Sequence, residues 1–159
     1  MVGTTRNSDV LWLNETEREV WLALVGAVIR LPQALDRQLR RDSQLTHFEY
    51  QIMAMLSDAP MRQMRMTALA ELTEGSLPRL SQAVKRMQER GLLVRLVDPE
   101  DGRCTVVGLT KVGYAALVTA APGHVETVRR LVFDALSTAQ AQQLRRACMR
   151  IVAATEQDV

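Results

Sequence analysis

The sequence predicts a mainly α-helical protein with one small β-hairpin. Apolar residues recur at three- and four-residue steps through most of the 159 residues, which is the pattern of helices with one buried face. The pattern changes to β-type runs only at residues 92–97 and 104–109, on either side of a turn sequence. The length suits one domain, and Leu, Val, Ala and Met must fill its core because aromatic residues make up only 4%.

The first helix is expected over about residues 15–41. The apolar residues Trp21, Leu24, Val28, Leu31 and Leu35 follow the 3.5-residue spacing of a packing seam between helices. Four more apolar residues fall outside this seam, namely Val20, Leu22, Val25 and Ile29. One small domain packing on one side cannot bury a helix that is apolar on several faces, so this helix needs a further packing surface.

Three shorter helices are expected next. Thr46 and Glu49 form a capping box for a helix over residues 46–58. A short helix over residues 67–73, with Leu69 and Leu72 pointing inward, leads to a turn at Gly75. The helix that follows, residues 76–90, ends at Gly91, which suits the left-handed conformation that often follows a helix.

The hairpin and two final helices complete the order of elements. Residues 98–102 are a turn sequence between the two β runs. Thr110 is expected to cap a helix that Pro122 and Gly123 interrupt, and residues 137–140 contain a capping box for the last helix. A short helix, a tight turn, a helix and a hairpin in this order predict a winged helix-turn-helix.

The helix over residues 76–90 carries the residues expected to contact double-stranded DNA. Its buried stripe is expected to be Leu77, Leu80, Val84 and Met87. Four cations and one anion within residues 76–91 give a local charge of +3, and they lie off this stripe. Arginine can donate two parallel hydrogen bonds to a guanine edge, and glutamine can pair similarly with adenine. The expected contacts are Ser76, Pro78, Arg79, Gln82, Lys85 and Arg86. The alternative, an amphipathic helix with a solvated charged face, is disfavoured by the adjacent hairpin.

The hairpin provides a second set of candidates. Asp101 can pair with Arg103 and hold its guanidinium for a narrow minor groove, where the potential is most negative. The alternative is a surface turn with an exposed ion pair of little energetic value. Arg95 is either a phosphate contact or a solvated charge on an edge strand, and Arg62 and Arg65 are further candidates.

Several motifs resemble the MarR family of bacterial transcriptional regulators. They are Leu69-Ala70-Glu71-Leu72, residues 76–87, residues 89–93, Asp98-Pro99-Glu100-Asp101-Gly102-Arg103 and Leu109-Thr110-Lys111-Val112-Gly113. The motif at the hairpin tip is the most specific of them. The resemblance implies one domain, residues 1–159, that forms a homodimer. Residues of about 15–42 and 110–156 would form the dimerisation helices, and residues of about 45–109 the DNA-binding lobe.

The resemblance also implies a mode of DNA binding. Helix 76–91 of each subunit would enter one major groove of a pseudo-palindromic operator, and the wing, residues 92–109, would reach the flanking minor groove. The expected role is repression. Matching positions assign recognition to Ser76, Pro78, Arg79, Gln82 and Lys85, and the wing contact to Asp101 and Arg103. Glu100 departs from the basic residue common in the family, which lowers the positive charge of this wing.

An effector site is a further implication of the resemblance. Many family members release DNA when a small phenolic or other apolar anion binds between the dimer base and the DNA-binding lobe. The residues that can line such a pocket here are Trp21, His47, Phe48 and Tyr50. The alternative is that these four side chains serve core or dimer packing.

Other function classes find little support. The sequence has no phosphate loop, G-x-S-x-G or H-E-x-x-H motif, so no enzyme or cofactor is expected. His47 and His124 lack the short spacing typical of metal ligands. Cys104 and Cys148 form no C-x-x-C pair and are expected to be reduced thiols. The longest apolar run, residues 20–29, is too short to cross a membrane, and the first fourteen residues form no secretory signal. A cytoplasmic location is therefore expected.

A protein–protein interaction module built on the same fold is the alternative function. Binding through phosphates weakens steeply with salt, whereas an apolar protein interface does not. The charge of +3 on residues 76–91 favours DNA.

Overall fold

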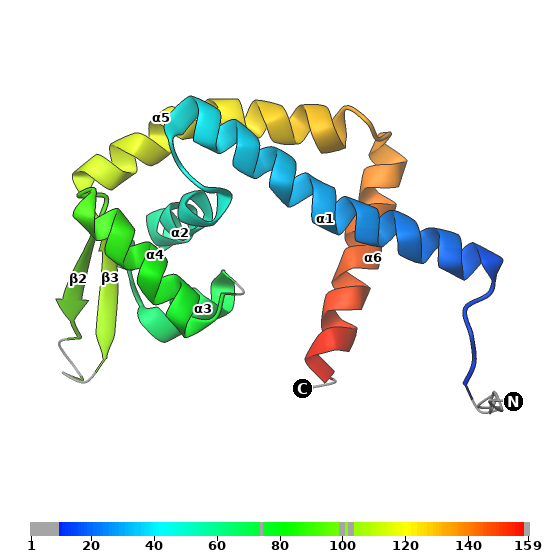
Figure 1. The fold of residues 1–159 in the computed structure, drawn as a ribbon, viewed down its shortest axis with the longest axis horizontal. Helices are drawn as coiled ribbons and strands as arrows, with labels where there is room; N and C mark the ends of the chain where they lie inside the picture. The colour runs from blue at the N-terminus through cyan, green and yellow to red at the C-terminus, as the bar shows by residue number, and fades with distance from the viewer. Residues whose placement is uncertain (1–9, 74, 99–100, 102–103, 158–159) are drawn as a thin grey trace, which may run out of the picture. The chain divides into compact units, whose positions relative to one another are not determined.

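The computed structural model describes residues 10–73, 75–98, 101 and 104–157, and its chain divides into two compact units. The first unit ends at Gln33, and the second comprises Ala34–Val159. The long helix α1 (Glu15–Ser43) contributes to both units (Figure 1). Its start is fixed by Asn14, whose side-chain oxygen accepts a hydrogen bond of 2.9 Å from the Glu17 amide. The first predicted helix is thereby confirmed.

The part of α1 in the first unit leaves large apolar side chains exposed. They are Val20, Trp21, Leu22, Val28 and Ile29. Val20, Leu22 and Ile29 are among the residues from which the sequence predicted a need for a further packing surface, whereas Val25, the fourth of them, is half-buried.

In the second unit, α2 (His47–Asp58), α3 (Met66–Leu72) and α4 (Leu77–Glu89) follow the end of α1. The capping box of α2 is confirmed. The Glu49 amide donates to Thr46 Oγ1 (3.0 Å), and the Thr46 amide donates to Glu49 Oε2 (2.9 Å). The turn after α4 is confirmed as well, since Gly91 has a φ of 72°.

Two residues expected to point inward are exposed, so these predictions are wrong. Leu72 is 57% exposed and Leu77 is 47% exposed. Leu72 is the last residue of α3, and Leu77 is the first of α4. Helical side chains lean toward the N-terminus, so that of Leu77 projects beyond the packed part of its helix. The buried stripe of α4 is Leu80, Ala83, Val84 and Met87.

The predicted hairpin is confirmed, but the sheet has a third strand. Strands β1 (Gln63–Arg65), β3 (Thr105–Leu109) and β2 (Leu93–Val97) lie in the order β1-β3-β2, and both pairings are antiparallel. Val107 of β3 faces Met64 on one side and Arg95 on the other. The three residues of β1 include no β-branched side chain, so their sequence does not predict a strand. Strand β1 forms because it pairs with β3.

Helix α5 (Lys111–Val128) corrects another expectation, because it runs through Pro122 and Gly123 without interruption. A proline removes one backbone donor, but Leu117 and Ala120 before it and Thr127 after it are buried, so packing holds the helix on both sides. A short π-helical segment, Arg129–Phe133, follows. The capping box before α6 (Thr138–Gln157) is confirmed by reciprocal hydrogen bonds between Ser137 and Gln140.

The core of the second unit lies among α2, α3, α4, the sheet and α5, which gather beside one another in Figure 1. Its fully buried side chains include Leu39, Ile52, Leu56, Leu69, Leu80, Met87 and Val107. This core fixes which side of α4 faces outward. Within the described residues, no helix is long and apolar enough to cross a membrane.

Candidate nucleic-acid interface

The exposed side of α4 carries all six residues predicted to contact DNA on this helix. They are Ser76, Pro78, Arg79, Gln82, Lys85 and Arg86. Ser76 is the N-cap, and its hydroxyl oxygen accepts a hydrogen bond from the Arg79 amide at 3.4 Å. Pro78 lies in the first turn, where its missing donor costs little. The start of this helix therefore combines polar, apolar and cationic groups on one accessible surface.

Arg79 is held against an aromatic ring from another helix. Its guanidinium carbon lies 4.2 Å from the centroid of the Phe48 ring on α2. The same ring also lies close to the turn between α3 and α4, where a Cβ on Gly75 would lie 2.9 Å from Phe48 Cζ. Phe48 was predicted to line an effector pocket, and the structure places it against Arg79 of α4.

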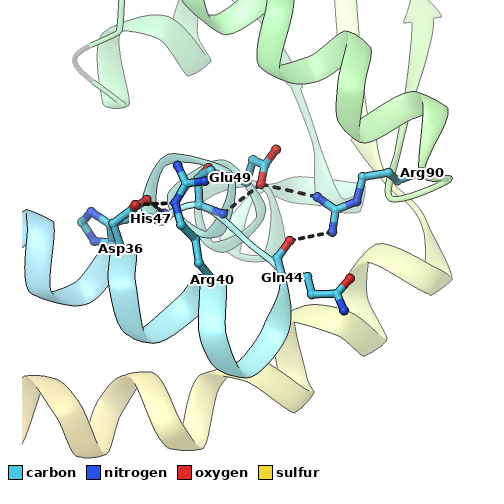
Figure 2. Close-up of polar contacts among 7 residues, drawn as sticks. Asp36, Arg40, Gln44, His47, Glu49 and Arg90 are labelled. Atoms are coloured by element: carbon cyan, nitrogen blue, oxygen red, sulfur yellow. Dashed lines mark hydrogen bonds and ion pairs between the residues drawn. The ribbon is translucent and has the colours of Figure 1, made fainter.

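Arg90, the C-cap of α4, is exposed, but its guanidinium is bonded to the chain. One of its terminal nitrogens lies 3.4 Å from the buried carboxylate of Glu49, and the other donates to the Gln44 carbonyl at 3.0 Å (Figure 2). These contacts tie the end of α4 to the α1–α2 junction. The positive charge on the exposed side of α4 comes from Arg79, Lys85 and Arg86.

Arg95 joins the wing to the recognition helix. Its Nη2 donates to the Ser81 carbonyl at 2.9 Å and to the Ser81 hydroxyl at 3.1 Å. A groove of about 350 Å³ lies between α3, α4 and the hairpin, lined in part by Arg65, Leu77, Ser81 and Arg95. Arg95 therefore has a structural partner on α4. The sequence had predicted either a phosphate contact or a solvated charge, and neither alternative included this partner.

The base of the wing depends on Asp98, which sequence reasoning did not single out as a site residue. Its side chain is 5% exposed and forms an ion pair of 2.5 Å with the half-exposed Arg65 of β1. It also accepts a hydrogen bond of 3.3 Å from the Asp101 amide. An aspartate at the start of a turn commonly accepts such hydrogen bonds. The position of Asp98 at the start of the predicted turn could therefore have indicated this role. Arg65, predicted as a candidate DNA contact, is directed to Asp98.

Of the two remaining cationic candidates, Arg62 contacts another side chain, and Arg103 lies outside the described residues. Arg62 lies over the Tyr114 ring, with its guanidinium carbon 3.6 Å from the centroid. Asp101 is exposed, whereas Arg103, its predicted partner, lies outside the described residues. The same holds for Glu100, the residue that departs from the family pattern.

Of the four predicted effector-pocket residues, the structure brings two together. His124 of α5 lies between His47 and Tyr50, with ring centroids 5.8 Å and 4.2 Å away. The His47 amide donates to Asp36, which also pairs with Arg40 (Figure 2). Burial lowers the pKa of both histidines, and the Asp36 carboxylate partly opposes this for His47. Trp21 lies in the first unit.

The cysteines lack the features of reactive thiols or metal ligands. The Cys104 thiol donates to the Asp101 carboxylate at 3.4 Å, and this contact raises the pKa of the thiol. Cys148 is exposed on α6. Among the residues that the structure describes, no group of three or more His, Cys, Asp or Glu side chains is placed to hold a metal ion.

Comparison with known proteins identifies close relatives of this architecture. Residues 43–103 match the profile of the MarR family. Sco3205, a MarR family transcriptional regulator from Streptomyces coelicolor solved in complex with DNA, is 40% identical. The match has a TM-score of 0.86 and covers 92% of this chain and 91% of Sco3205.

Two further structures are similar. AbsC, a MarR family transcriptional regulator from Streptomyces coelicolor, is 31% identical with a TM-score of 0.87, over 92% of this chain and 99% of AbsC. MOSR from M. tuberculosis, solved with DNA, is 26% identical with a TM-score of 0.70, over 86% of this chain and 95% of MOSR. No protein of curated function matches the sequence.

Proposed function

The chain belongs to the MarR family of DNA-binding transcriptional regulators, and we propose that it is a repressor that binds a pseudo-palindromic operator as a homodimer. Members of this family are regulators, so the chain is not an enzyme. The observation that supports the proposed DNA contact is the exposed side of α4, where Arg79, Lys85 and Arg86 are cationic, whereas Arg90 is bonded to Glu49 and Gln44.

In this proposal, α4 enters the major groove through its first turns. Arg79 and Gln82 contact base edges, Pro78 contacts a thymine methyl, and Ser76 and Lys85 contact the phosphate backbone. Arg86 adds positive charge to the same side. Two subunits related by a two-fold axis then contact half-sites about one helical turn apart.

The wing, residues 92–109, is proposed to reach the minor groove through Asp101 and Arg103. Support comes from the base of the hairpin. The Asp98–Arg65 pair and the Arg95–Ser81 hydrogen bonds hold this base against β1 and α4. Arg95 is close enough to the exposed side of α4 to share a phosphate contact while it keeps Ser81 as a partner.

The dimer is proposed to form through residues of about 15–42 and 110–156, on either side of the DNA-binding lobe at about 45–109. In this proposal the whole chain, residues 1–159, acts as one domain. The exposed apolar residues of α1 and α6 support the assignment, because a second copy would cover them. A cytoplasmic location is part of the same proposal, since the operator is there.

A small aromatic or apolar anionic effector is proposed to bind beside α2. His47 and Tyr50 are the best supported residues, because His124 joins them in one half-buried cluster. Phe48 is less well placed, since its ring is packed against Arg79 and the turn at Gly75. Trp21 lies in the first unit, and its proposed role is in the dimerisation helix.

Selection of bound sequences from a random duplex library, at near-physiological salt, tests the proposal. The expected product is an inverted repeat. Replacement of Arg79 by Ala should cost about 1–3 kcal/mol of operator binding and relax the preference at one base pair of each half-site. Lys85→Ala should weaken binding to all sequences and lower the salt slope by about 1.

Arg37→Ala, which removes an exposed cation outside the proposed DNA-binding lobe, is the matched control. With its dimerisation verified by sedimentation equilibrium, it should leave both quantities unchanged. If a folded dimer enriches no sequence, the repressor proposal is wrong and the protein-interaction module is favoured. If the repeat is recovered but Arg79→Ala binds it as the wild type does, Arg79 does not contact a base.

A further inference from the structure

Phe48 occupies a position that connects α2 to the first turn of the recognition helix. It is the second residue of α2, it is half-buried, and it packs on the core. On one side its ring lies so close to the α3–α4 turn that a Cβ at position 75 would come within 2.9 Å of Cζ and 3.1 Å of Cε2. The ring therefore has little freedom to move toward this turn.

The ring also carries the Arg79 guanidinium, 4.2 Å from its centroid. A cation over an aromatic face is attracted by the π electrons. The backbone of Arg79 is fixed too, because its amide is bonded to the Ser76 hydroxyl. Both the main chain and the side chain of Arg79 are thus held by neighbours before any DNA is bound.

Stacking on the ring is compatible with base recognition. Hydrogen bonds to a base edge or a phosphate are donated in the plane of the guanidinium, so a cation–π contact through its face would leave these donors available. An unrestrained arginine loses rotamer freedom when it binds, and a stacked arginine has already lost much of it. Stacking should therefore favour the bound geometry.

We propose that Phe48 is a positioning residue that holds Arg79 ready for DNA and thereby contributes to sequence discrimination. This inference rests on the proposed function, in which α4 enters the major groove. Since immobilising one long side chain costs about 0.5–1.5 kcal/mol, loss of the stack should weaken binding about two- to tenfold for each half-site.

A double-mutant cycle with the selected operator tests the proposal. Binding of the wild type, Phe48→Leu, Arg79→Ala and the double variant is measured by fluorescence anisotropy, on the operator and on duplexes with single base changes. We expect Phe48→Leu to weaken operator binding and to reduce discrimination only at the base pair whose preference Arg79→Ala relaxes. In the Arg79→Ala background, Phe48→Leu should have no further effect.

Two more variants keep the result interpretable. Met61→Leu is an apolar substitution at a highly exposed site outside the proposed dimerisation helices, and it should bind as the wild type does. Gly75→Ala adds a Cβ that would press on the Phe48 ring. Even if Phe48→Leu does not fold, Gly75→Ala should weaken operator binding when Arg79 is present and have no further effect in the Arg79→Ala background.

Three outcomes would overturn the inference. An equal loss from Phe48→Leu with and without Arg79 would make Phe48 a residue of general structure. Tighter binding by Phe48→Leu would mean that the stack withholds Arg79 from DNA. If Arg79→Ala has no effect on operator binding, then Arg79 does not contact DNA as the proposed function requires, and this inference is wrong as well. The first two outcomes contradict only this inference and leave the proposed function intact.

Discussion

Asp98 is a buried, charged residue at the start of the turn that follows β2. Its carboxylate receives Arg65 from β1 and the amide of Asp101. A hydrogen bond to a charged group contributes about 1.5–3 kcal/mol, although the half-exposed Arg65 places this pair toward the lower end. The wing base is therefore held by one side chain that contacts two neighbouring segments.

Asp98→Ala is expected to lower the free energy of unfolding by about 2 kcal/mol, because it removes the buried carboxylate that Arg65 and the Asp101 amide contact. Urea denaturation followed by circular dichroism measures the change. Asp134→Ala is the matched control, since the Arg129–Asp134 pair has a distance of 3.7 Å and both side chains are exposed. Equal effects of the two substitutions would contradict the anchoring role of Asp98.

The histidines near α2 predict a pH dependence of stability. Burial lowers the pKa of His47 and His124 below the ordinary value of 6.5. A charge on His47, whose ring lies 5.8 Å away, lowers the pKa of His124 further, and the Asp36 carboxylate only partly opposes burial at His47. The unfolded chain therefore binds more protons below about pH 6.5, and stability should fall as the pH decreases from 7.5 to 5.5.

Replacement of His124 by Gln is expected to flatten this dependence, measured by urea denaturation at one protein concentration across the range. Titration of Asp36 does not contribute to the pH dependence between pH 7.5 and 5.5. Burial raises its pKa, but hydrogen bonds from the His47 amide and Arg40 outweigh burial and leave it below 3.8. Its contribution is lost only at lower pH. An unchanged slope in His124→Gln would show that His124 does not titrate in this window.

At the level of elements, the junction of the hairpin and α5 explains the Leu-Thr-x-x-Gly motif. The Thr110 hydroxyl donates to the Gly91 and Leu92 carbonyls (2.8 and 3.0 Å) and accepts from the Gly113 amide (2.9 Å). A Cβ at position 113 would lie 2.1 Å from the Leu92 carbonyl oxygen. The start of α5 is thus bonded to the end of α4 and lies against the backbone of the wing.

Gly113→Ala is expected to destabilise the protein by about 2–3 kcal/mol, because the new methyl group meets backbone that cannot rotate away. Thermal unfolding provides the measurement. Val112→Ala changes the exposed neighbour and should have little effect. If Gly113→Ala melts at the wild-type temperature, the close approach of α5 to Leu92 is not maintained in solution.

At the level of the whole molecule, the first and last long helices each expose several large apolar side chains. Helix α6 has no buried residue within one chain, and it exposes Leu144, Met149, Ile151 and Val152. In a monomer such surface is a liability. The proposed homodimer would cover it and give each molecule two recognition helices.

Ile151→Asp is expected to raise the dissociation constant of the dimer by at least about 100-fold, because two isoleucines are lost from the interface and two charges are buried. Sedimentation equilibrium measures the dimer. Operator affinity should fall with it, since a monomer contacts one half-site. Gln142→Asp, on the opposite side of α6, is the control. A dimer unaffected by Ile151→Asp would exclude this face of α6 from the interface.

The sequence by itself determined the elements whose signals are local. Capping boxes at Thr46 and Ser137 and the left-handed position at Gly91 depend on residues within one turn of each other, so pattern and structure agree there. The exposed positions of the α4 candidates follow for the same reason, because helical periodicity separates Arg79, Gln82 and Lys85 from the buried stripe.

Tertiary structure decided the features that depend on distant residues. Strand β1 forms because β3 pairs with it, and α5 continues through Pro122 because its buried residues hold both sides. The partners of Arg65, Arg79 and Arg95 come from residues 14 to 33 positions away. No local period encodes such contacts, since the energy of a side-chain pair depends on where packing places both partners.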